Sequence, residues 1–266
     1  RSTLFPYTTL FRSGRRYMRP WDPRWKKRKA VPASFYEPYY INRTSLVIGA
    51  EAAMEDHILD IIKHHVPGFI GENELKQYAV ILPLQLINGE WHIILEKRAA
   101  DMTVQPGEIS LPGGGVEAGD ASPRMAAVRE IGEELGIAAQ ELQIIGTLDL
   151  FIFPFNLIIY PFVAVLDEHA AFKLNQAEVE KCLVVPLQEL KEQTPLAAEI
   201  ILKVIPPPGY PFHLIPQGKD YPFRAGRLHH YFYEYDGEII WGITARILLN
   251  FFAIINSATS PDKITE

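Results

Sequence analysis

Three glutamates in one short segment are the residues of this chain whose type and spacing could do chemistry. Glu130, Glu133 and Glu134 would fall on one face of a helix, at about 100° per residue. Carboxylates near a helix end oppose its negative pole and repel one another at i,i+4. A cluster that local rules disfavour is a candidate functional site. Its hard oxygen atoms suit Mg²⁺ or Mn²⁺, and the alternative is a solvated acidic helix face.

The sequence around these glutamates predicts one short helix that follows a glycine loop. Ser122 is a good N-cap, and Pro123 suits the first helical position. Gly136 supplies a left-handed stop. Between them, an apolar stripe recurs at helical spacing and consists of Val128, Ile131 and Leu135.

Two further features flank the glutamates. Arg129 stands four residues before Glu133 and can pair with it, so we expect Arg129 to orient the carboxylates. Gly113 and Gly114 lie in the loop before the helix. Because they lack a side chain, their backbone can come close to a metal ion or a phosphate.

The stretch from Gly113 to Ile137 resembles the Nudix box, whose core reads Arg-Glu-apolar-x-Glu-Glu-x-Gly-apolar. The matching residues, in order, are Arg129, Glu130, Ile131, Glu133, Glu134, Gly136 and Ile137. If Gly114 is the box glycine, the acidic position after it is Asp120, and the gap to Arg129 is one residue longer than in the general box. If Gly115 is taken instead, that position is Ala121. The extra residue is similar to what the coenzyme A pyrophosphatase branch shows.

The residues before the box carry a second resemblance to this branch. Its pattern is Lys-Arg-Ser/Ala, a spacer, Gly, three residues and Phe-Pro-Gly-Gly. The matching segments here are Lys97-Arg98-Ala99, Gly107 and Leu111-Pro112-Gly113-Gly114. The chain departs at Thr103, where the branch has arginine, and at Leu111, where it has phenylalanine. Lys97 and Arg98 can pair with substrate phosphate, and the alternative is two surface cations at a strand end.

The resemblance implies an α+β fold, the Nudix-type α/β/α sandwich with a mixed sheet and an N-terminal extension. It also implies hydrolysis of the pyrophosphate bond of coenzyme A or acyl-CoA to 3′,5′-ADP and (acyl-)4′-phosphopantetheine, with Mg²⁺ or Mn²⁺ as cofactor. One alternative is hydrolysis of ADP-ribose or another nucleoside diphosphate derivative. Another is a non-catalytic nucleotide-binding regulator, but a pure binder need not keep all three glutamates.

Within this reaction, the expected metal ligands are Glu130 and Glu134, which stand one helical turn apart. We expect Glu133 to be a third ligand or part of the network that activates water. Glu178 precedes Val179 in a polar loop and resembles a superfamily position that often lies near the metals. It is therefore an expected additional ligand or water-activating base, and the alternative is a solvent-facing loop glutamate.

Six apolar runs predict the strands that must position the box. They are Tyr78–Leu86, Glu90–Lys97, Leu142–Phe153, Leu157–Leu166, Leu228–Tyr235 and Glu238–Trp241. Asn88-Gly89 and Asp236-Gly237 are expected as tight hairpin turns. We expect Gly242–Ile255 to form a closing helix, and Ile205–Arg227, rich in proline and aromatic residues, to form an ordered loop that shapes a substrate pocket.

The composition is that of a globular domain with elaborations, with 266 residues, 48% of them hydrophobic and 22% charged. Residues 1–13 are expected to be an artefact, because Thr3–Ser13 looks like a translated sequencing adapter. The expected organisation then continues with a basic arm and helical extension at 14–74, the Nudix hydrolase domain at 75–256 and a tail at 257–266. Ser45–Val66 is the expected helix of the extension.

The charge distribution and the cysteine content limit which partners and which cellular location we expect. Residues 14–45 are basic while the whole chain carries a net charge of −6, so the remainder is acidic. The basic arm could pack on the domain, or it could form a patch that binds nucleic acid or a membrane. We expect the first, with neither nucleic acid nor a membrane as a partner. A single cysteine, Cys182, excludes an internal disulfide and fits a reducing, cytoplasmic location. The expected partner is a small-molecule nucleotide substrate, and a homodimer is left open.

Overall fold

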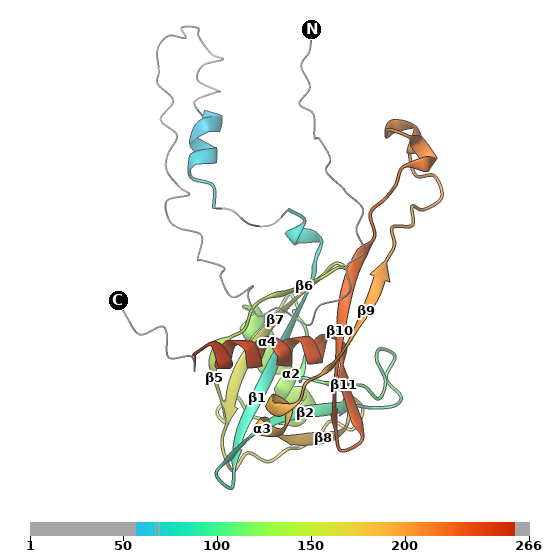
Figure 1. The fold of residues 1–266 in the computed structure, drawn as a ribbon. Helices are drawn as coiled ribbons and strands as arrows, with labels where there is room; N and C mark the ends of the chain where they lie inside the picture. The colour runs from blue at the N-terminus through green and yellow to red at the C-terminus, as the bar shows by residue number, and fades with distance from the viewer. Residues whose placement is uncertain (1–56, 67, 69, 259–266) are drawn as a thin grey trace. The chain divides into compact units, whose positions relative to one another are not determined.

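The computed structural model describes residues 57–66, 68 and 70–258 (Figure 1). The chain divides into two compact units, Arg1–Pro67 and Gly68–Glu266. In the first unit, residues 57–63 form a helix within the range expected for the N-terminal extension. The earlier part of that expected helix, the expected artefact at 1–13 and the basic arm at 14–45 lie outside the described residues, as does the tail beyond residue 258.

The second unit is built on an eight-stranded mixed sheet in which β3, β2, β1, β7 and β5 lie side by side. Its strands are β1 (Lys76–Ile87), β2 (Glu90–Arg98), β3 (Ile109–Ser110), β4 (Gly113–Gly115), β5 (Leu142–Thr147), β6 (Phe151–Phe153), β7 (Leu157–Leu166) and β8 (Val179–Pro186). Strands β1 and β7 are parallel, and the other pairs are antiparallel. In addition, β4 pairs with β1, β6 with β7 and β8 with β2.

Helices and a smaller sheet complete the unit. They are α2 (Pro123–Leu135), α3 (Leu187–Glu192), α4 (Gly242–Ala258), the strands β9 (Leu196–Leu202), β10 (Gly226–Tyr235) and β11 (Glu238–Trp241), and the short 3₁₀ turns η3 (Glu72–Glu74), η4 (Phe212–Leu214) and η5 (Gly218–Asp220). The three additional strands lie in the order β11-β10-β9. None of the helices that the structure describes is long and apolar enough to cross a membrane.

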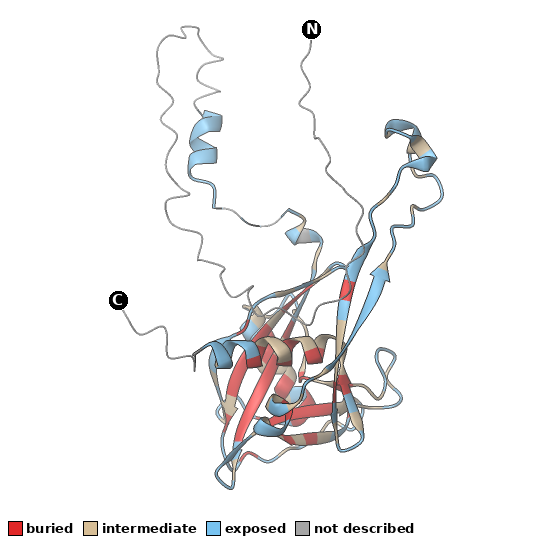
Figure 2. Ribbon diagram, viewed as in Figure 1, coloured by how far each residue is buried: buried red, intermediate tan, exposed pale blue. Residues whose placement is uncertain are grey.

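The core has two parts, one on each face of the large sheet. Side chains alternate along a strand, so Ile81 packs with α2 whereas Leu82 packs with α4 and α3. The same alternation separates Ile94 from Leu95 in β2. Figure 2 shows the buried residues concentrated in the strands of this sheet and in the helices that cover it. The sheet thus lies between helices on both faces, which confirms the predicted α+β sandwich.

The local signals for turns are confirmed. Asn88 and Gly89 have φ angles of 52° and 85°, and Asp236 and Gly237 have 50° and 74°. Positive φ at both central positions is the geometry of a two-residue type I′ hairpin turn, which Asn-Gly and Asp-Gly favour. The sequence therefore determines the registers of β1 with β2 and of β10 with β11.

The prediction of one buried strand over Leu142–Phe153 is wrong. Two strands occupy this range, and β5 lies at the sheet edge with most of its residues exposed. Both pair with β7, and the ladder is interrupted opposite Pro161. Leu148 donates its backbone N–H to the Pro161 carbonyl at 3.0 Å, but proline has no N–H to donate in return. Regular pairing therefore resumes only at Phe151.

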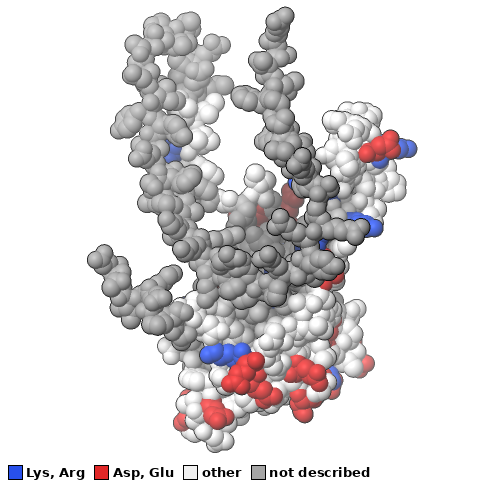
Figure 3. Space-filling view, viewed as in Figure 1, with Lys and Arg blue, Asp and Glu red and all other residues white. Residues whose placement is uncertain are grey.

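Acidic side chains dominate the lower part of the face shown in Figure 3. This distribution agrees with a domain whose charge is predominantly negative outside the basic N-terminal segment.

Candidate active site

Helix α2 carries the glutamates as the sequence predicts. Ser122 caps its start, accepting a hydrogen bond from the Met125 N–H at 3.3 Å, and Pro123 is the first helical residue. Gly136 ends it in the left-handed conformation at φ 70°. The glutamates differ in environment: Glu134 is buried, Glu130 is partly buried and Glu133 is exposed. They therefore have unequal access to water although they share one helix.

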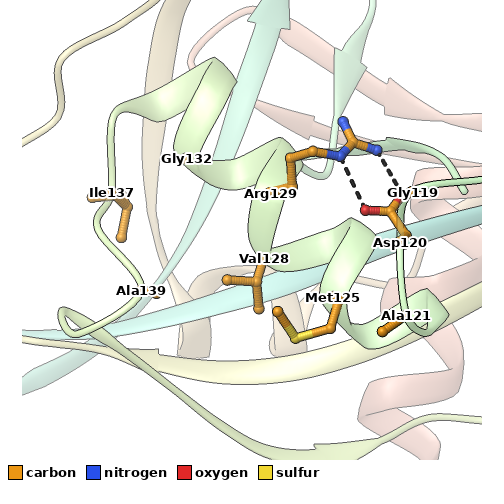
Figure 4. Close-up of a pocket in the computed structure, with 9 residues that line it drawn as sticks. All are labelled: Gly119, Asp120, Ala121, Met125, Val128, Arg129, Gly132, Ile137 and Ala139. Carbon is orange, nitrogen blue, oxygen red and sulfur yellow. Dashed lines mark hydrogen bonds and ion pairs between the residues drawn. The ribbon is translucent and has the colours of Figure 1, made fainter. Parts of the chain in front are cut away.

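Arg129 holds the loop and the helix together. Its guanidinium donates to Asp120 at 3.0 and 3.2 Å, to Glu130 at 2.9 Å and to Glu133 at 3.0 Å. It also donates to the Gly115 carbonyl at 3.1 Å. Figure 4 shows the Arg129–Asp120 pair, whose guanidinium holds the pKa of the Asp120 carboxyl below its usual range. This contact favours Asp120 as the acidic residue of the box, which corresponds to Gly114 as the box glycine.

Two glycines allow β4 to approach the carboxylates closely. The Gly113 N–H donates to Glu134 Oε2 at 2.8 Å. At Gly113, where φ is 151°, a Cβ atom would lie 2.3 Å from the Ala79 carbonyl oxygen. At Gly114, a Cβ atom would lie 2.3 Å from Glu130 Oε1. The backbone contact at Gly113 requires glycine there, whereas a side chain at position 114 would displace the carboxylate of Glu130.

A fourth buried carboxylate, Glu96 of β2, was not predicted. Its residue is 1% exposed, and one oxygen accepts a hydrogen bond from the Ser110 hydroxyl at 3.0 Å. Burial raises the pKa of Glu96, and the negative charges of Glu178 and Glu130 raise it further. The available signal was a single glutamate at the end of the apolar run Ile93-Ile94-Leu95, where an isolated buried charge is unusual.

The pKa of Glu134 depends on its neighbour Glu96. Burial is the main cause that raises the pKa of Glu134, and the charge of Glu96 is the next. Burial also raises the pKa of Glu130, against the opposing effect of Arg129. Glu178 adds to the repulsion at Glu130 and at Glu96, so the structure brings this predicted residue close to the cluster.

This donor set fits a divalent cation. Several carboxyl groups are buried or partly buried beside one another, and Glu96 Oε2 has no hydrogen-bond partner within the described part of the chain. Hard carboxylate oxygens of this kind suit Mg²⁺ or Mn²⁺. In residues 57–66, 68 and 70–258, no three His, Cys, Asp or Glu side chains already surround one point that could hold a metal ion. Binding would therefore require the carboxylates to close in, including those that Arg129 now engages.

A cavity of about 690 Å³ adjoins the carboxylate cluster, and residues of β3 and β4 are part of its lining. Its polar end includes Arg98, Ser110, Gly113 and Gly114. The Ser110 hydroxyl and the Gly113 N–H also bond to the buried carboxylates, so they connect the two sites. Most of the rest of the wall is apolar and consists of Val80, Leu111, Phe153, Phe155, Leu157, Ile159, Ile200, Leu202, Leu228, Trp241 and Ile243. The wall also contains polar residues, which are Gln105, Glu108, His230, Thr244 and Arg246. None of the box glutamates lines this cavity.

The structure separates Lys97 from Arg98. Arg98 lines the cavity and donates from Nε to the Val104 carbonyl at 3.3 Å. Lys97 lies toward β11 instead, where its Nζ pairs with Glu238 at 2.9 Å and with Glu180 at 3.7 Å. The hydrogen bond to Glu238 raises the pKa of Lys97. Its ion pairs with Glu238 and Glu180 thus engage Lys97 outside the lining of the cavity.

The expected loop Ile205–Arg227 is ordered, but its residues do not line this cavity. It projects at the far end of the β9–β10 hairpin (Figure 1), where Tyr210 stacks edge-on against Phe212 and Tyr221 against Phe223. The flanking strands contribute instead, through Ile200, Leu202, Leu228 and His230. The aromatic residues of the loop thus pack against one another rather than against the cavity.

A second, more open groove of about 440 Å³ runs along the outer face of α2 (Figure 4). It is lined by apolar and small residues, among them Met125, Val128 and Ile137, and it reaches Arg129 and Asp120. The box glutamates are absent from its lining, so the groove offers no carboxylate cluster of its own.

We expect the metal-free protein to lose stability as the pH rises above about 4.5, the usual pKa of glutamate. Folded Glu96 and Glu134 keep protons that the unfolded chain has released, so the folded state binds more protons in this range. Thermal unfolding of chelator-treated protein between about pH 5.5 and about pH 8.5 measures the effect. Glu134→Gln should flatten the slope, and an unfolding temperature that rises with pH would contradict the expectation.

Residues 76–205 match the family model of the NUDIX domain. Together with the sandwich fold and the box helix described above, this match and the relatives below show that residues 76–205 are similar to the NUDIX domain of Nudix hydrolases.

Three curated relatives show how far the likeness extends. Nudix hydrolase 22, chloroplastic, of Arabidopsis thaliana is 28% identical over 63% of this chain and 51% of that protein. The uncharacterized Nudix hydrolase NudL of Photorhabdus laumondii is 29% identical over 64% of this chain and 80% of that protein. Peroxisomal coenzyme A diphosphatase NUDT7 of Mus musculus is 27% identical over 42% of this chain and 47% of that protein. The chain thus spans about half the length of the plant and mouse relatives.

Proposed function

We propose that this protein hydrolyses the pyrophosphate bond of coenzyme A or acyl-CoA to 3′,5′-ADP and (acyl-)4′-phosphopantetheine. The shape of the cavity is the observation that carries the proposal. Its polar end, with Arg98 and two glycines, adjoins the carboxylates, and its remaining wall is largely apolar. A diphosphate fits the first part, and a long pantetheine or acyl arm fits the second.

The residues divide the chemistry between them. When bound by Glu130 and Glu134, a divalent cation supplies charge neutralisation at the diphosphate and lowers the pKa of water. Glu133 is a third ligand or part of the water-activating network, and Glu178 is a further ligand or the base that takes the proton from the attacking water. Arg129 orients Glu130 and Glu133 through its hydrogen bonds.

Substrate orientation falls to the groups at the polar end of the cavity. Arg98 is the proposed partner of a phosphate oxygen there, because it lines the cavity beside Gly113 and Gly114. Its planar guanidinium suits paired contacts with phosphate. Lys97, engaged with Glu180 and Glu238, has no such part in the proposal.

Two other observations support the coenzyme A branch. The segment from Lys97 to Gly114 has the spacing of its pre-box pattern. One of the relatives is also named as a coenzyme A diphosphatase. We further propose a cytoplasmic enzyme that acts on a small molecule, with a monomer and a homodimer as the two assemblies to distinguish.

A substrate panel tests the proposal. With Mg²⁺ or Mn²⁺, the purified protein should release 3′,5′-ADP from coenzyme A and acyl-CoA, identified by chromatography and mass spectrometry. Phe155→Ala should lower kcat/KM for acyl-CoA about tenfold and leave that for ADP-ribose unchanged, because Phe155 is part of the apolar wall. Ile152→Ala is the matched control, since Ile152 is also exposed, at 50% against 61% for Phe155, but lies outside the cavity lining.

Each outcome of the panel has a clear meaning. Efficient cleavage of ADP-ribose without release of 3′,5′-ADP from any coenzyme A substrate would replace the proposal with the ADP-ribose alternative. Tight nucleotide binding with no product from any substrate would favour a regulator.

A further inference from the structure

Glu96 lies where a strand residue would normally be apolar. It follows Ile94 by two positions in β2, and Ile94 belongs to the core cluster beneath α2. Because side chains alternate along a strand, Glu96 is on this same face of the sheet. Its residue is only 1% exposed, so water cannot solvate the carboxylate. A buried carboxylate needs hydrogen bonds or a counter-charge to be tolerated.

The protein supplies only part of that compensation. Glu96 Oε1 accepts the Ser110 hydroxyl at 3.0 Å, whereas Oε2 has no partner in the part of the chain that the structure describes. The charged groups that act on Glu96 include two acids, Glu178 and Glu130, and one cation, Arg98. Arg98 directs its Nε to a backbone carbonyl at 3.3 Å. One oxygen of Glu96 is thus left without a hydrogen-bond partner among neighbouring acidic groups.

We propose that Glu96 provides an oxygen ligand to the divalent cation that Glu130 and Glu134 bind, from the sheet side of the site. The inference rests on the proposed function, because it concerns the same cation. It assigns a ligand outside the Nudix box, on a strand packed beneath the box helix. Ser110 becomes a positioning residue, since its hydroxyl fixes one oxygen of Glu96 and leaves the other available.

The competing explanation is structural. Glu96 could keep its proton permanently and donate a hydrogen bond to a neighbouring carboxylate, with no contact to a metal ion. Glutamine has nearly the same shape and is also neutral, so it would substitute well in that role. The two explanations therefore predict opposite effects of Glu96→Gln on metal affinity.

Metal binding without substrate tests the inference. The full chain, stripped with chelator, is titrated with Mn²⁺, and free Mn²⁺ is measured by electron paramagnetic resonance. Glu96→Gln should raise the Mn²⁺ Kd at least about tenfold and reduce the increase in Tm that Mn²⁺ produces. Glu90→Gln is the matched control, because it makes the same change at an exposed position of β2 and should bind Mn²⁺ as the wild type does.

Glu96→Asp is the second variant. It keeps a carboxylate but sets it back by one methylene, so an intermediate loss of Mn²⁺ affinity is expected. If circular dichroism shows that Glu96→Gln is unfolded, Glu96→Asp decides the question: weakened binding supports the inference, and wild-type binding overturns it.

The outcomes separate this inference from the proposed function. Wild-type Mn²⁺ affinity in a folded Glu96→Gln protein overturns the ligand role of Glu96 and leaves the coenzyme A proposal standing. Absence of Mn²⁺ binding by the wild type overturns both. Weakened binding in Glu96→Gln, together with no cleavage of coenzyme A by the wild type, supports the ligand and removes only the substrate class.

Discussion

Glu134→Gln is expected to reduce turnover about a thousandfold while the fold is retained. Glu134 is 4% exposed, bonds to the Gly113 N–H at 2.8 Å and carries a pKa raised by burial. Glutamine keeps the shape and can still accept the Gly113 N–H, but it cannot supply a negative oxygen to a metal ion. Loss of such a ligand removes several kcal/mol of transition-state stabilisation, and each 1.4 kcal/mol corresponds to a factor of about ten.

Steady-state kinetics with the best substrate of the panel measure this effect, and thermal unfolding confirms that the variant is folded. The same substitution also separates an enzyme from a regulator, because a nucleotide sensor could keep its ligand affinity in Glu134→Gln. Glu90→Gln serves again as control, since it should keep wild-type kcat. A Glu134→Gln protein with full kcat would remove this carboxylate from the reaction.

The second large effect is expected for Arg129→Lys. Lysine keeps the positive charge but lacks the planar fork that engages Asp120, Glu130 and Glu133 together. Each charge-assisted hydrogen bond contributes about 1.5–3 kcal/mol, so loss of two of them predicts a decrease in kcat of roughly a hundredfold or more. KM should change little, because Arg129 orients ligands and does not line the large cavity.

The matched control is Arg124→Lys, which changes an exposed arginine in the first turn of the same helix. It should leave kcat, KM and the unfolding temperature near their wild-type values. If Arg129→Lys instead raised KM and left kcat unchanged, Arg129 would bind substrate rather than orient carboxylates. The split between the two kinetic constants therefore tests the positioning role directly.

Local chemistry was sufficient to predict the box helix and its surroundings. Ser122, Pro123 and Gly136 act within a few residues of themselves, through capping and backbone preference, so their effect can be read without the fold. The hairpin turns at Asn88-Gly89 and Asp236-Gly237 are local in the same way. The pairing of Arg129 with Glu133 at 3.0 Å also follows from helical spacing alone.

Contacts between distant segments could not be derived in this manner. The division of Leu142–Phe153 into two strands depends on Pro161, which becomes relevant only when β7 lies beside it. The direction of Lys97 depends on Glu238, a residue of the C-terminal hairpin. The loop Ile205–Arg227 has the composition of a pocket wall, yet the length of β9 and β10 carries it beyond the cavity.

The sequence by itself determined which groups this protein has for chemistry: a capped helix with three glutamates, one arginine to orient them, and glycines on the preceding loop. Only the tertiary structure decided that Glu96 joins them, that Arg98 rather than Lys97 reaches the cavity, and that an apolar wall adjoins the polar end. The physical reason is the range of the interactions. Caps and turns act between near neighbours, whereas burial and charge coupling depend on which distant strands and helices pack together.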